Sequence, residues 1–429
     1  MSGRLIIKNG RVVDPSQQLD AVLDLAIQDG VIRLCGRNID ASGSEVFDAS
    51  DMVVAPGFID MHVHLREPGF EYAETIESGS RAAAAGGFTS ICCMPNTQPV
   101  NDSPTVTSYI IERARRHAIV NVYPIGAITK GSAGEELAQI TSMTHAGIVA
   151  ISDDGRPVMN ARLVRRAMEF AKSLNIPLIE HCEDLHLSAG GDMHEGVESV
   201  RLGLHGIPRA SEDVMVARDI LLAELTGARY HVAHISSKNA VEMVAFAKSR
   251  GLAVTAEATP HHFALADRDM RPYDSNYKMK PPLREPQDVE AVTRGLASGA
   301  IDAVATDHAP HPGDEKMQEF ERCPFGIIGL ETAIPLTLER LLHPGLVSLT
   351  RFVSMFTEKP ATILSLDKGT LKTGVAADVT IFDLNQPWTY DVNKSPSKSR
   401  NTPFQGKAFK GGAVATIVGG KMVWRRDDW

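Results

Sequence analysis

The feature that most constrains the fold is a regular alternation of short apolar runs with amphipathic helical patterns through the middle of the chain. Such alternation is typical of parallel βα units, and eight units predict a (β/α)8 barrel with insertions over residues 57–365. The predicted strands are 58–64, 88–96, 120–129, 147–153, 176–183, 229–235, 252–258 and 301–306. The predicted helices include 74–85, 104–117, 161–174, 211–225, 239–249, 287–297 and 330–342.

The two ends of the chain follow a different pattern. Residues 4–54 and 369–426 alternate apolar and polar residues between turn signals such as Asn9-Gly10 and Gly419-Gly420. Short β segments of this kind are marginal alone, so we expect one composite β-sandwich built from residues 1–56 and 366–429. The Ser-, Lys- and Pro-rich stretch 393–412 is expected to be an exposed loop.

Charge and cysteine usage narrow the functional class. The chain has 53 acidic and 44 basic residues, a net charge of −9, which argues against a nucleic-acid binder. No apolar run reaches the length of about 18 residues that spans a bilayer, and the N-terminus lacks a signal-peptide pattern. The five cysteines are scattered without CxxC spacing, so we expect no disulfide framework and a cytoplasmic location.

The first predicted strand carries two histidines with a spacing that suits metal binding. Residues i and i+2 of a strand point to the same face, so His62 and His64 project together. They lie at the C-terminal end of the strand, where barrel active sites are found. An HxH pair alone is weak support for a metal ion, because it is more often a core or surface pair.

Other predicted strands end in the same residue types. These residues are Asp153 and Asp154, His181, His234, and Asp307. Carboxylates and imidazoles that converge on one barrel mouth are costly unless a cation compensates them, so the set predicts a metal site. With either Asp153 or Asp154 there are six ligands, too many for one tetrahedral zinc. Two ions with a hydroxide between them are therefore expected, with the hydroxide as nucleophile and Asp307 as proton shuttle.

Longer motifs around these residues resemble a known family. They are 56–69 (PGFIDMHVHLREPG), 94–97 (MPNT), 180–181 (EH), 233–236 (AHIS) and 305–311 (ATDHAPH). The whole chain resembles the amidohydrolase superfamily and, within it, the class I dihydroorotases. The resemblance implies reversible cyclisation of N-carbamoyl-L-aspartate to L-dihydroorotate in pyrimidine biosynthesis, by attack of a metal-bridging hydroxide on the cyclic amide.

The resemblance also implies roles for the strand-end residues. His62 and His64 would bind one divalent ion and His181 and His234 the other, with zinc as the expected metal. Many relatives bridge their ions with a carbamylated lysine after strand four, but this segment, 147–155, contains no lysine. Class I dihydroorotases use an aspartate, which matches Asp154 and leaves Asp153 beside it. Asp307 is implied as both metal ligand and catalytic base.

Substrate contacts are implied as well. Arg66, Asn96 and His311 match residues that bind the substrate carboxylate in the family, and His64 is expected to face substrate too. Arg66 could instead form a solvent-exposed salt bridge with Glu67. The backbone of Phe325 and Gly326 matches a segment that contacts the pyrimidine ring. Lys280 stands where many relatives have asparagine, so it could supply a positive charge or point to solvent.

The remaining histidines are expected to play smaller parts. His231, three residues before His234, is expected to face the opposite side of the strand and to pack behind the barrel. His194, like other histidines on helices and loops, is expected at the surface. The charged segment 313–322 is expected to be a mobile lid or a solvated loop.

Two other readings remain open. One is an allantoinase- or hydantoinase-type cyclic amidase, which the missing lysine and the Arg66–Asn96 pair disfavour. The other is a noncatalytic dihydroorotase-like scaffold for aspartate transcarbamoylase, from which loss of ligands would be expected. Our leading expectation is an active, metal-dependent homodimeric enzyme, and association with aspartate transcarbamoylase remains open for an active enzyme too.

Overall fold

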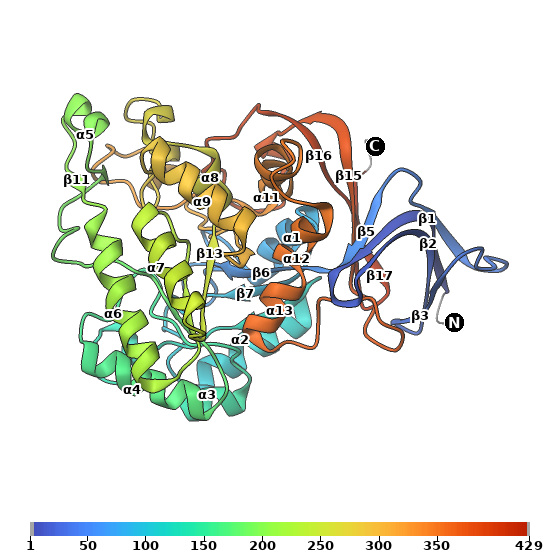
Figure 1. The fold of residues 1–429 in the computed structure, drawn as a ribbon, viewed down its shortest axis with the longest axis horizontal. Coiled ribbons are helices and arrows are strands. Elements are labelled where there is room, and N and C mark those ends of the chain that lie inside the picture. The colour runs from blue at the N-terminus through green and yellow to red at the C-terminus, as the bar shows by residue number, and fades with distance from the viewer. Residues whose placement is uncertain (1–3, 427–429) are drawn as a thin grey trace.

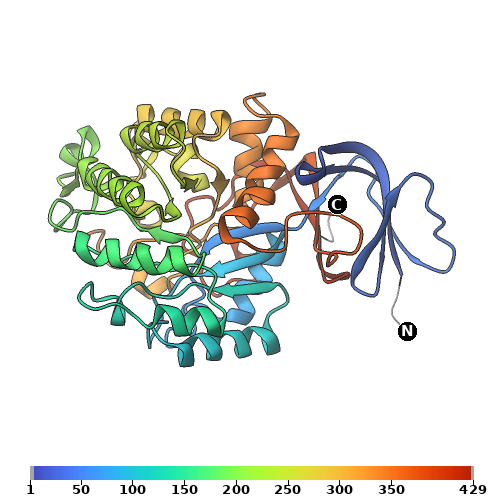
Figure 2. The same cartoon turned by 60° about the horizontal axis from the view of Figure 1, so that its bottom comes forward.

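The structure, a computed structural model, describes residues 4–426. It is a barrel with a β-sheet unit at one end. The N-terminal and C-terminal segments lie side by side in that unit (Figures 1 and 2). None of the helices in residues 4–426 is long and apolar enough to cross a bilayer.

The barrel strands follow the predicted order. They are β6 (Phe58–Val63), β7 (Phe88–Cys93), β8 (Asn121–Pro124), β9 (Leu178–Glu180), β12 (Tyr230–Val232), β13 (Val254–Ala258) and β14 (Ala303–Val304). Parallel bridges Gly126–Ile151 and Ile151–Leu178 join β8 to β9 through the fourth predicted strand. The parallel bridge Val63–His308 closes the circle. The predicted parallel βα barrel is therefore confirmed.

The fourth strand is shorter than expected and consists of isolated bridges around Ile151. Its neighbours explain this, because Pro124 and Pro177 flank it on either side and have no N–H to donate. Their carbonyls do accept hydrogen bonds, from Val149 N at 3.1 Å and from Ile151 N at 3.2 Å. The segment is thus held between β8 and β9 without a full ladder.

Helices surround the strands. They are α1 (Ile76–Ala85), α2 (Pro104–His117), α3 (Ile140–Ala146), α4 (Ala161–Ser173), α6 (Ala210–Thr226), α7 (Lys238–Ser249), α9 (Pro286–Ser298), α11 (Ala333–Thr337), α12 (Leu349–Phe356) and α13 (Glu358–Leu364). The predicted helix 330–342 is a 3-10 turn, α11 and a π-helical segment, Leu338–Leu342, in succession. Shorter elements are β10 (Met193–His194), α5 (Val197–Leu202), β11 (Gly206–Ile207), α8 (Pro260–Ala264) and α10 (Gly313–Lys316).

The terminal strands of both chain ends combine in one composite β unit, as predicted, and their hydrogen bonds join them in one sheet. They are β1 (Leu5–Asp14), β2 (Leu19–Gln28), β3 (Val31–Gly36), β4 (Glu45–Asp48), β5 (Val53–Pro56), β15 (Val379–Thr389), β16 (Ala408–Val418) and β17 (Lys421–Arg425). The order is β17-β16-β15-β5-β1-β2-β3, with β4 on β1, so β5 and β15 join the two ends of the chain. The exact domain limits at residues 56 and 366 stay a prediction.

Gly57 links the sheet to the barrel, between β5 and β6. A Cβ on this residue would lie 2.1 Å from Thr89 Oγ1, so only glycine fits. Its N–H donates to Asp378 O at 2.8 Å. The close approach places β6, and with it His62, at a set position relative to the sheet.

The stretch 393–412 differs from the exposed loop that was expected. Ser395, Ser397 and Ser399 are buried in alternation, and β16 begins at Ala408. Ser397 Oγ donates to Glu74, and Ser399 Oγ donates to Ala73 O at 2.8 Å. The serine side chains of this stretch therefore form hydrogen bonds to the barrel instead of facing solvent. We refer to residues 393–407 as the strap.

Candidate metal centre

The six predicted ligands meet inside the barrel mouth. His62 lies on β6 and His64 directly after it, and the others follow the fourth strand, β9, β12 and β14. All six are buried: His62, His64, Asp154, His181, His234 and Asp307. Parallel strands bring their carboxyl ends to one face of a barrel, which is why residues from five strand ends reach one place.

Asp154 is at the centre of this cluster. Its Oδ1 lies 3.3 Å from His62 Nε2, 3.5 Å from His181 Nδ1 and 3.4 Å from His234 Nε2. Its Oδ2 lies 3.4 Å from His64 Nε2. One carboxylate therefore faces all four imidazoles, the arrangement needed to bridge two ions.

Asp307 completes one side of the cluster. Its Oδ1 lies 3.0 Å from His64 Nε2 and 3.6 Å from His62 Nε2. Candidate ligand atoms of His62, His64 and Asp307 lie within 4.8 Å of one another, and so do those of His62, Asp154 and His234. Two atoms bound at about 2.1 Å to one tetrahedral zinc are about 3.4 Å apart, so these separations suit a metal ion.

Three buried atoms of the six ligands have no hydrogen-bond partner among residues 4–426: His234 Nδ1, His62 Nε2 and Asp154 Oδ1. Of these, His62 Nε2 and Asp154 Oδ1 lie 3.3 Å apart within the cluster. Such groups are rare in folded proteins because each costs free energy. Both point at the other ligands, so a cation between them would satisfy both, and the residues present fit a metal ion.

The electrostatics favour ionised carboxylates. Burial acts to raise the pKa of Asp154, but His62, His181 and His234 outweigh it and hold this pKa well below its usual range. The pKa of Asp307 is likewise lowered, because His64 and His62 overcome the effect of burial. Both carboxylates are therefore available as anionic ligands.

Three of the histidines have a hydrogen-bond acceptor beside the ring nitrogen that faces away from the cluster. His62 Nδ1 lies 2.7 Å from Glu257 Oε1, His64 Nδ1 2.8 Å from Asn96 Oδ1, and His181 Nε2 3.0 Å from Glu183 Oε2. An acceptor on one ring nitrogen holds the N–H there and leaves the other nitrogen with its lone pair toward the cluster. Sequence reasoning missed Glu257 and Glu183, because a lone glutamate near a strand end carries no spacing signal.

Asp153 lies outside the cluster. Its Oδ1 accepts hydrogen bonds from Ile128 N at 2.8 Å and Thr129 N at 3.2 Å, and its Oδ2 accepts one from Thr129 Oγ1. Burial raises its pKa to about 6 in spite of these bonds. Of the two aspartates left open by the residue pattern, only Asp154 faces the histidines.

The predicted carboxylate-binding residues line the rim. Arg66 Nε donates to Pro310 O at 3.1 Å, and one of its terminal nitrogens lies 3.3 Å from His311 Nε2. Glu67 pairs with Arg113 at 2.6 Å, so the alternative Arg66–Glu67 bridge is not formed. Asn96 holds His64 as described, and its Nδ2 lies 3.5 Å from Asp154 O. Arg66, His311 and Asn96 thus lie around the same mouth.

The Phe325–Gly326 segment adjoins this rim. Phe325 O lies 2.9 Å from His311 Nε2, and Gly326 N donates to Lys278 O at 2.9 Å. Lys280 is not directed to open solvent: its Nζ lies 2.7 Å from Glu183 Oε1 and 4.7 Å from the centre of the Phe325 ring. The structure therefore gives Lys280 a carboxylate partner that the sequence did not reveal.

Two histidines lie elsewhere than expected. His231 is inside the barrel, with Nδ1 2.8 Å from Thr255 Oγ1 and Nε2 3.3 Å from Glu257 Oε2. His194 is buried rather than at the surface and lies 3.3 Å from a terminal nitrogen of Arg284. The segment 313–322 is mostly exposed, but Lys316 and Phe320 within it are buried. The expected lid motion stays a prediction.

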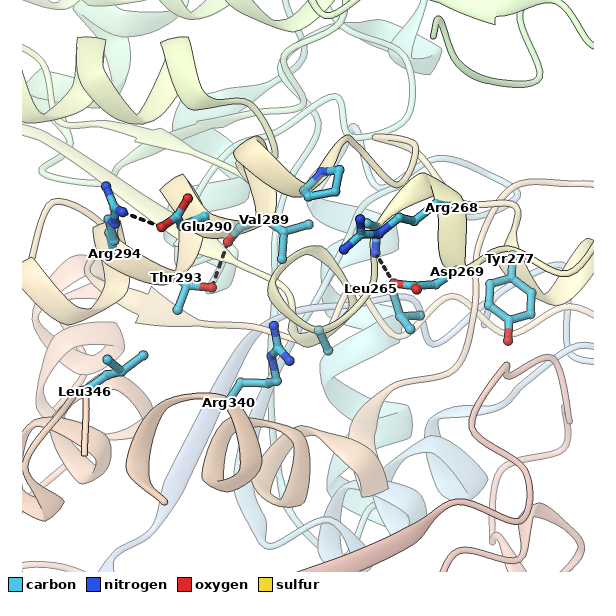
Figure 3. A pocket seen from close by; sticks show the side chains of 13 residues that line it. Leu265, Arg268, Asp269, Tyr277, Val289, Glu290, Thr293, Arg294, Arg340 and Leu346 are labelled. Carbon is cyan, nitrogen blue, oxygen red and sulfur yellow. Dashed lines mark hydrogen bonds and ion pairs between the residues drawn. The ribbon is translucent and has the colours of Figure 1, made fainter. Parts of the chain in front are cut away.

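A separate cavity lies apart from this centre. It has a volume of about 700 Å³ and is lined by α8, α9 and the segment Leu338–Leu342, with no predicted site residue in its wall. Figure 3 shows Arg340 pointing into it and Arg294 paired with Glu290. The buried cluster, not this cavity, holds the chemistry-bearing residues.

Comparisons with known proteins agree with the geometry. A family model described as Dihydro-orotase-like matches residues 51–240. A dihydroorotase of Solibacter usitatus is 67% identical over 98% of each chain, and one of Pelobacter propionicus is 52% identical over 98% of this chain and all of that protein. The L-hydantoinase (dihydropyrimidinase) structure from Arthrobacter aurescens has a TM-score of 0.89 at 26% identity, covering 99% of this chain and 96% of that one. The chain belongs to the dihydroorotase family.

Proposed function

We propose that this chain is a metal-dependent cyclic amidohydrolase that interconverts N-carbamoyl-L-aspartate and L-dihydroorotate in pyrimidine biosynthesis. The observation that supports it most is the burial of four imidazoles and two carboxylates around the unpartnered Asp154 Oδ1, beside a rim with Arg66 and His311. The intact ligand set disfavours a noncatalytic scaffold.

The proposed site holds two divalent ions, with zinc as the expected metal. His62 and His64 would hold one and His181 and His234 the other, with Asp154 shared and Asp307 as a further ligand. Such ions polarise a carbonyl and lower the pKa of bound water so that it can attack at neutral pH.

Asp307 is proposed to move the proton. In hydrolysis its carboxylate accepts a proton from the attacking water, and the same carboxyl delivers it to the ring nitrogen as the C–N bond breaks. Ring closure reverses these transfers: the Asp307 carboxylate takes the proton from the attacking nitrogen as the C–N bond forms and returns it to the oxygen that leaves as water. Hydrolysis releases one proton overall, because a cyclic amide and water become a second carboxylate, and cyclisation consumes one. Hydrolysis should therefore rise with pH and cyclisation should fall.

Arg66, His311 and Asn96 are proposed to bind the substrate carboxylate. A guanidinium presents two parallel donors that match the two oxygens of a carboxylate. Arg66 Nε donates to Pro310 O, and one terminal nitrogen lies 3.3 Å from His311 Nε2, so the guanidinium and this imidazole lie together at the mouth. The backbone of Phe325 and Gly326 would contact the ring.

The direct test is metal analysis combined with assays in both directions on the isolated chain. We expect about two divalent ions per chain, loss of activity on strong chelation, and recovery with Zn²⁺ or Co²⁺. Full activity in metal-free protein would rule out this function.

The substrate class is tested by Arg66→Lys. This change keeps the charge but removes the planar pair of donors, so it should cost about 1.5–3 kcal/mol of carboxylate recognition. The loss should be large for dihydroorotate and small for dihydrouracil, which lacks the ring carboxylate. Faster turnover of hydantoin or allantoin by unmutated protein would favour the alternative cyclic amidase.

We further propose a cytoplasmic homodimer. All five cysteines are unpaired, as expected in a reducing compartment. Helix α6 leaves Val214, Leu221 and Leu225 exposed at positions i, i+7 and i+11, an apolar stripe suited to an interface. Light scattering of the chain, alone and with an aspartate transcarbamoylase, separates a homodimer from a mixed assembly.

A further inference from the structure

The metal-facing atom of His181 differs from that of its neighbours. His62 and His64 direct Nε2 at the cluster, whereas His181 directs Nδ1, which lies 3.5 Å from Asp154 Oδ1. Its Nε2 points away and lies 3.0 Å from Glu183 Oε2. Nδ1 also lies 2.8 Å from His234 Nε2, so both nitrogens face the same point. If Nε2 carries the proton, Nδ1 presents its lone pair to an ion bound there. The orientation of His181 therefore depends on Glu183.

Glu183 in turn depends on Lys280. The oxygen that does not face His181, Oε1, accepts a hydrogen bond from Lys280 Nζ at 2.7 Å. The Glu183 side chain is 8% exposed and that of Lys280 is 28% exposed. A nearly buried carboxylate needs a positive partner to remain charged in place. Lys280 supplies that partner from the segment that follows α8.

Two observations keep Lys280 from acting as a free positive charge in the mouth. Its ammonium lies 4.7 Å from the centre of the Phe325 ring, so a carboxylate and an aromatic face both hold it. The space that it shares with Glu183 and His181 is a cavity of about 10 Å³, the size of one water molecule.

His62 also has a glutamate partner, Glu257, but among the residues that the structure describes this glutamate has no lysine beside it. The difference between Glu257 and Glu183 explains why only Glu183 needs Lys280. Glu257 is fully buried inside the barrel and lies 3.3 Å from His231 Nε2. Glu183 lies nearer the mouth, and without its lysine the carboxylate could turn toward solvent and release His181.

We propose that Lys280 is a positioning residue that acts through Glu183 to fix the proton and ring orientation of His181, and so sets the affinity of the second metal subsite. The proposal rests on the proposed function, because it assumes two bound ions. It replaces a direct contact between Lys280 and substrate.

The test measures metal binding apart from catalysis. Metal-free full-length protein is titrated with Co²⁺ and followed by its visible absorption, for unmutated protein and for Lys280→Met. We expect one ion to bind with unchanged affinity and the other about 10–100-fold more weakly, the usual effect of losing an outer partner of a metal-bound histidine. Lys280→Arg should restore most of the binding, because it keeps the charge.

Glu183→Gln links the two residues. It should weaken the same ion, and the Lys280→Met, Glu183→Gln double variant should bind no more weakly than Glu183→Gln alone, because both changes interrupt one chain of contacts. Lys407→Met is a matched control. Lys407 pairs with Glu339 at 3.1 Å and lies 5.4 Å from the centre of the Phe409 ring, but it is remote from the cluster.

The outcomes separate the two proposals. A higher KM for dihydroorotate with unchanged affinity for both ions in Lys280→Met would overturn the positioning role and restore a substrate contact. Additive losses in the double variant would also overturn it. Unmutated protein that binds two ions but does not convert dihydroorotate would contradict the proposed function while leaving the metal titration informative.

Discussion

Adjacent residues in this chain can have unrelated tasks. Asp153 accepts three hydrogen bonds from Ile128 and Thr129, whereas Asp154 faces the four histidines. Neighbours on an extended backbone point to opposite sides, so only one of the two can face the barrel axis. Variants of Asp153 and Asp154 should therefore have different effects.

We predict that Asp154→Ala loses metal and activity, while Asp153→Ala retains metal and loses stability. Removing the Asp153 carboxylate leaves buried donors of Ile128 and Thr129 unsatisfied, at about 1–3 kcal/mol each. Metal content and thermal melting of the two variants check this. Metal loss in Asp153→Ala with a normal Asp154→Ala would show that the two roles are reversed.

We predict that His194 makes the stability of the fold depend on pH. Burial, then the charges of Arg284 and Arg209, lower its pKa to about 4, against about 6.5 in an unfolded chain. Between these values the unfolded state binds more protons, so the free energy of unfolding falls as pH decreases from about 6.5 to 4. The contribution lost is up to about 3 kcal/mol.

His194→Asn should remove this contribution, and denaturant unfolding at several pH values measures it. The slope of unfolding free energy against pH should be smaller than in unmutated protein within that window. His186→Asn, at an exposed histidine, is the control and should leave the slope unchanged. An unchanged slope in His194→Asn would show that another group accounts for the acid sensitivity.

At the scale of elements, the site is formed where strands stop being regular. β12 ends at Val232, and His234 has a φ of 31°, a left-handed value that is costly for histidine. Asp307, after β14, has a φ of 47°, and Arg66, after β6, has a φ of 61°. Because the backbone turns at these residues, their side chains no longer alternate between the two faces of a strand. Backbone strain of this kind is concentrated at functional sites.

The strap also contacts segments at the barrel mouth. Asn401 Nδ2 donates to Ala309 O at 2.9 Å and Gly326 O at 3.0 Å, and its Oδ1 accepts from His311 N at 3.2 Å. One side chain therefore holds both the segment after β14 and the Phe325–Gly326 segment.

We predict that Asn401→Ala raises the KM for dihydroorotate more than it lowers kcat, because it loosens His311 without touching the metal cluster. It should also cost about 1–3 kcal/mol for each buried group left unpaired. Steady-state kinetics and thermal melting measure the two effects. Asn393→Ala, at the exposed start of the strap, should change neither, and an equal effect there would contradict the assignment.

At the scale of the whole molecule, the terminal sheet and the barrel share a hydrophobic core. Phe382 on β15 packs 5.6 Å from Phe58 on β6, and Phe58 stacks on Phe356 of α12 at 4.9 Å between ring centres. Thr380 Oγ1 accepts from Phe58 N and donates to Gly87 O. Because apolar and polar contacts both cross the boundary, we expect the two units to unfold together.

Phe382→Ala tests this coupling. Loss of a fully buried phenylalanine should cost about 3–5 kcal/mol. Calorimetry should still show one transition at a lower temperature, with the sheet and barrel unfolding as one. Two separate transitions would mean that the units are independent.

The sequence by itself determined the order of the elements and the types of residue at the strand ends. Hydrophobic periodicity is local, so it predicted the barrel, its helices and the composite terminal sheet, and parallel topology then brought His62, His64 and Asp307 to one face. It could not predict the partners of those residues. Glu257, Glu183 and Lys280 act through contacts between segments far apart in the chain, and strand alternation placed His231 on the wrong side because it assumed a regular strand up to His234. Likewise, the strap has the composition of an exposed loop, and its serines are buried only because the barrel surface supplies hydrogen-bond partners. Tertiary structure decided these points, because hydrogen-bond pairing and side-chain burial depend on which distant segments meet.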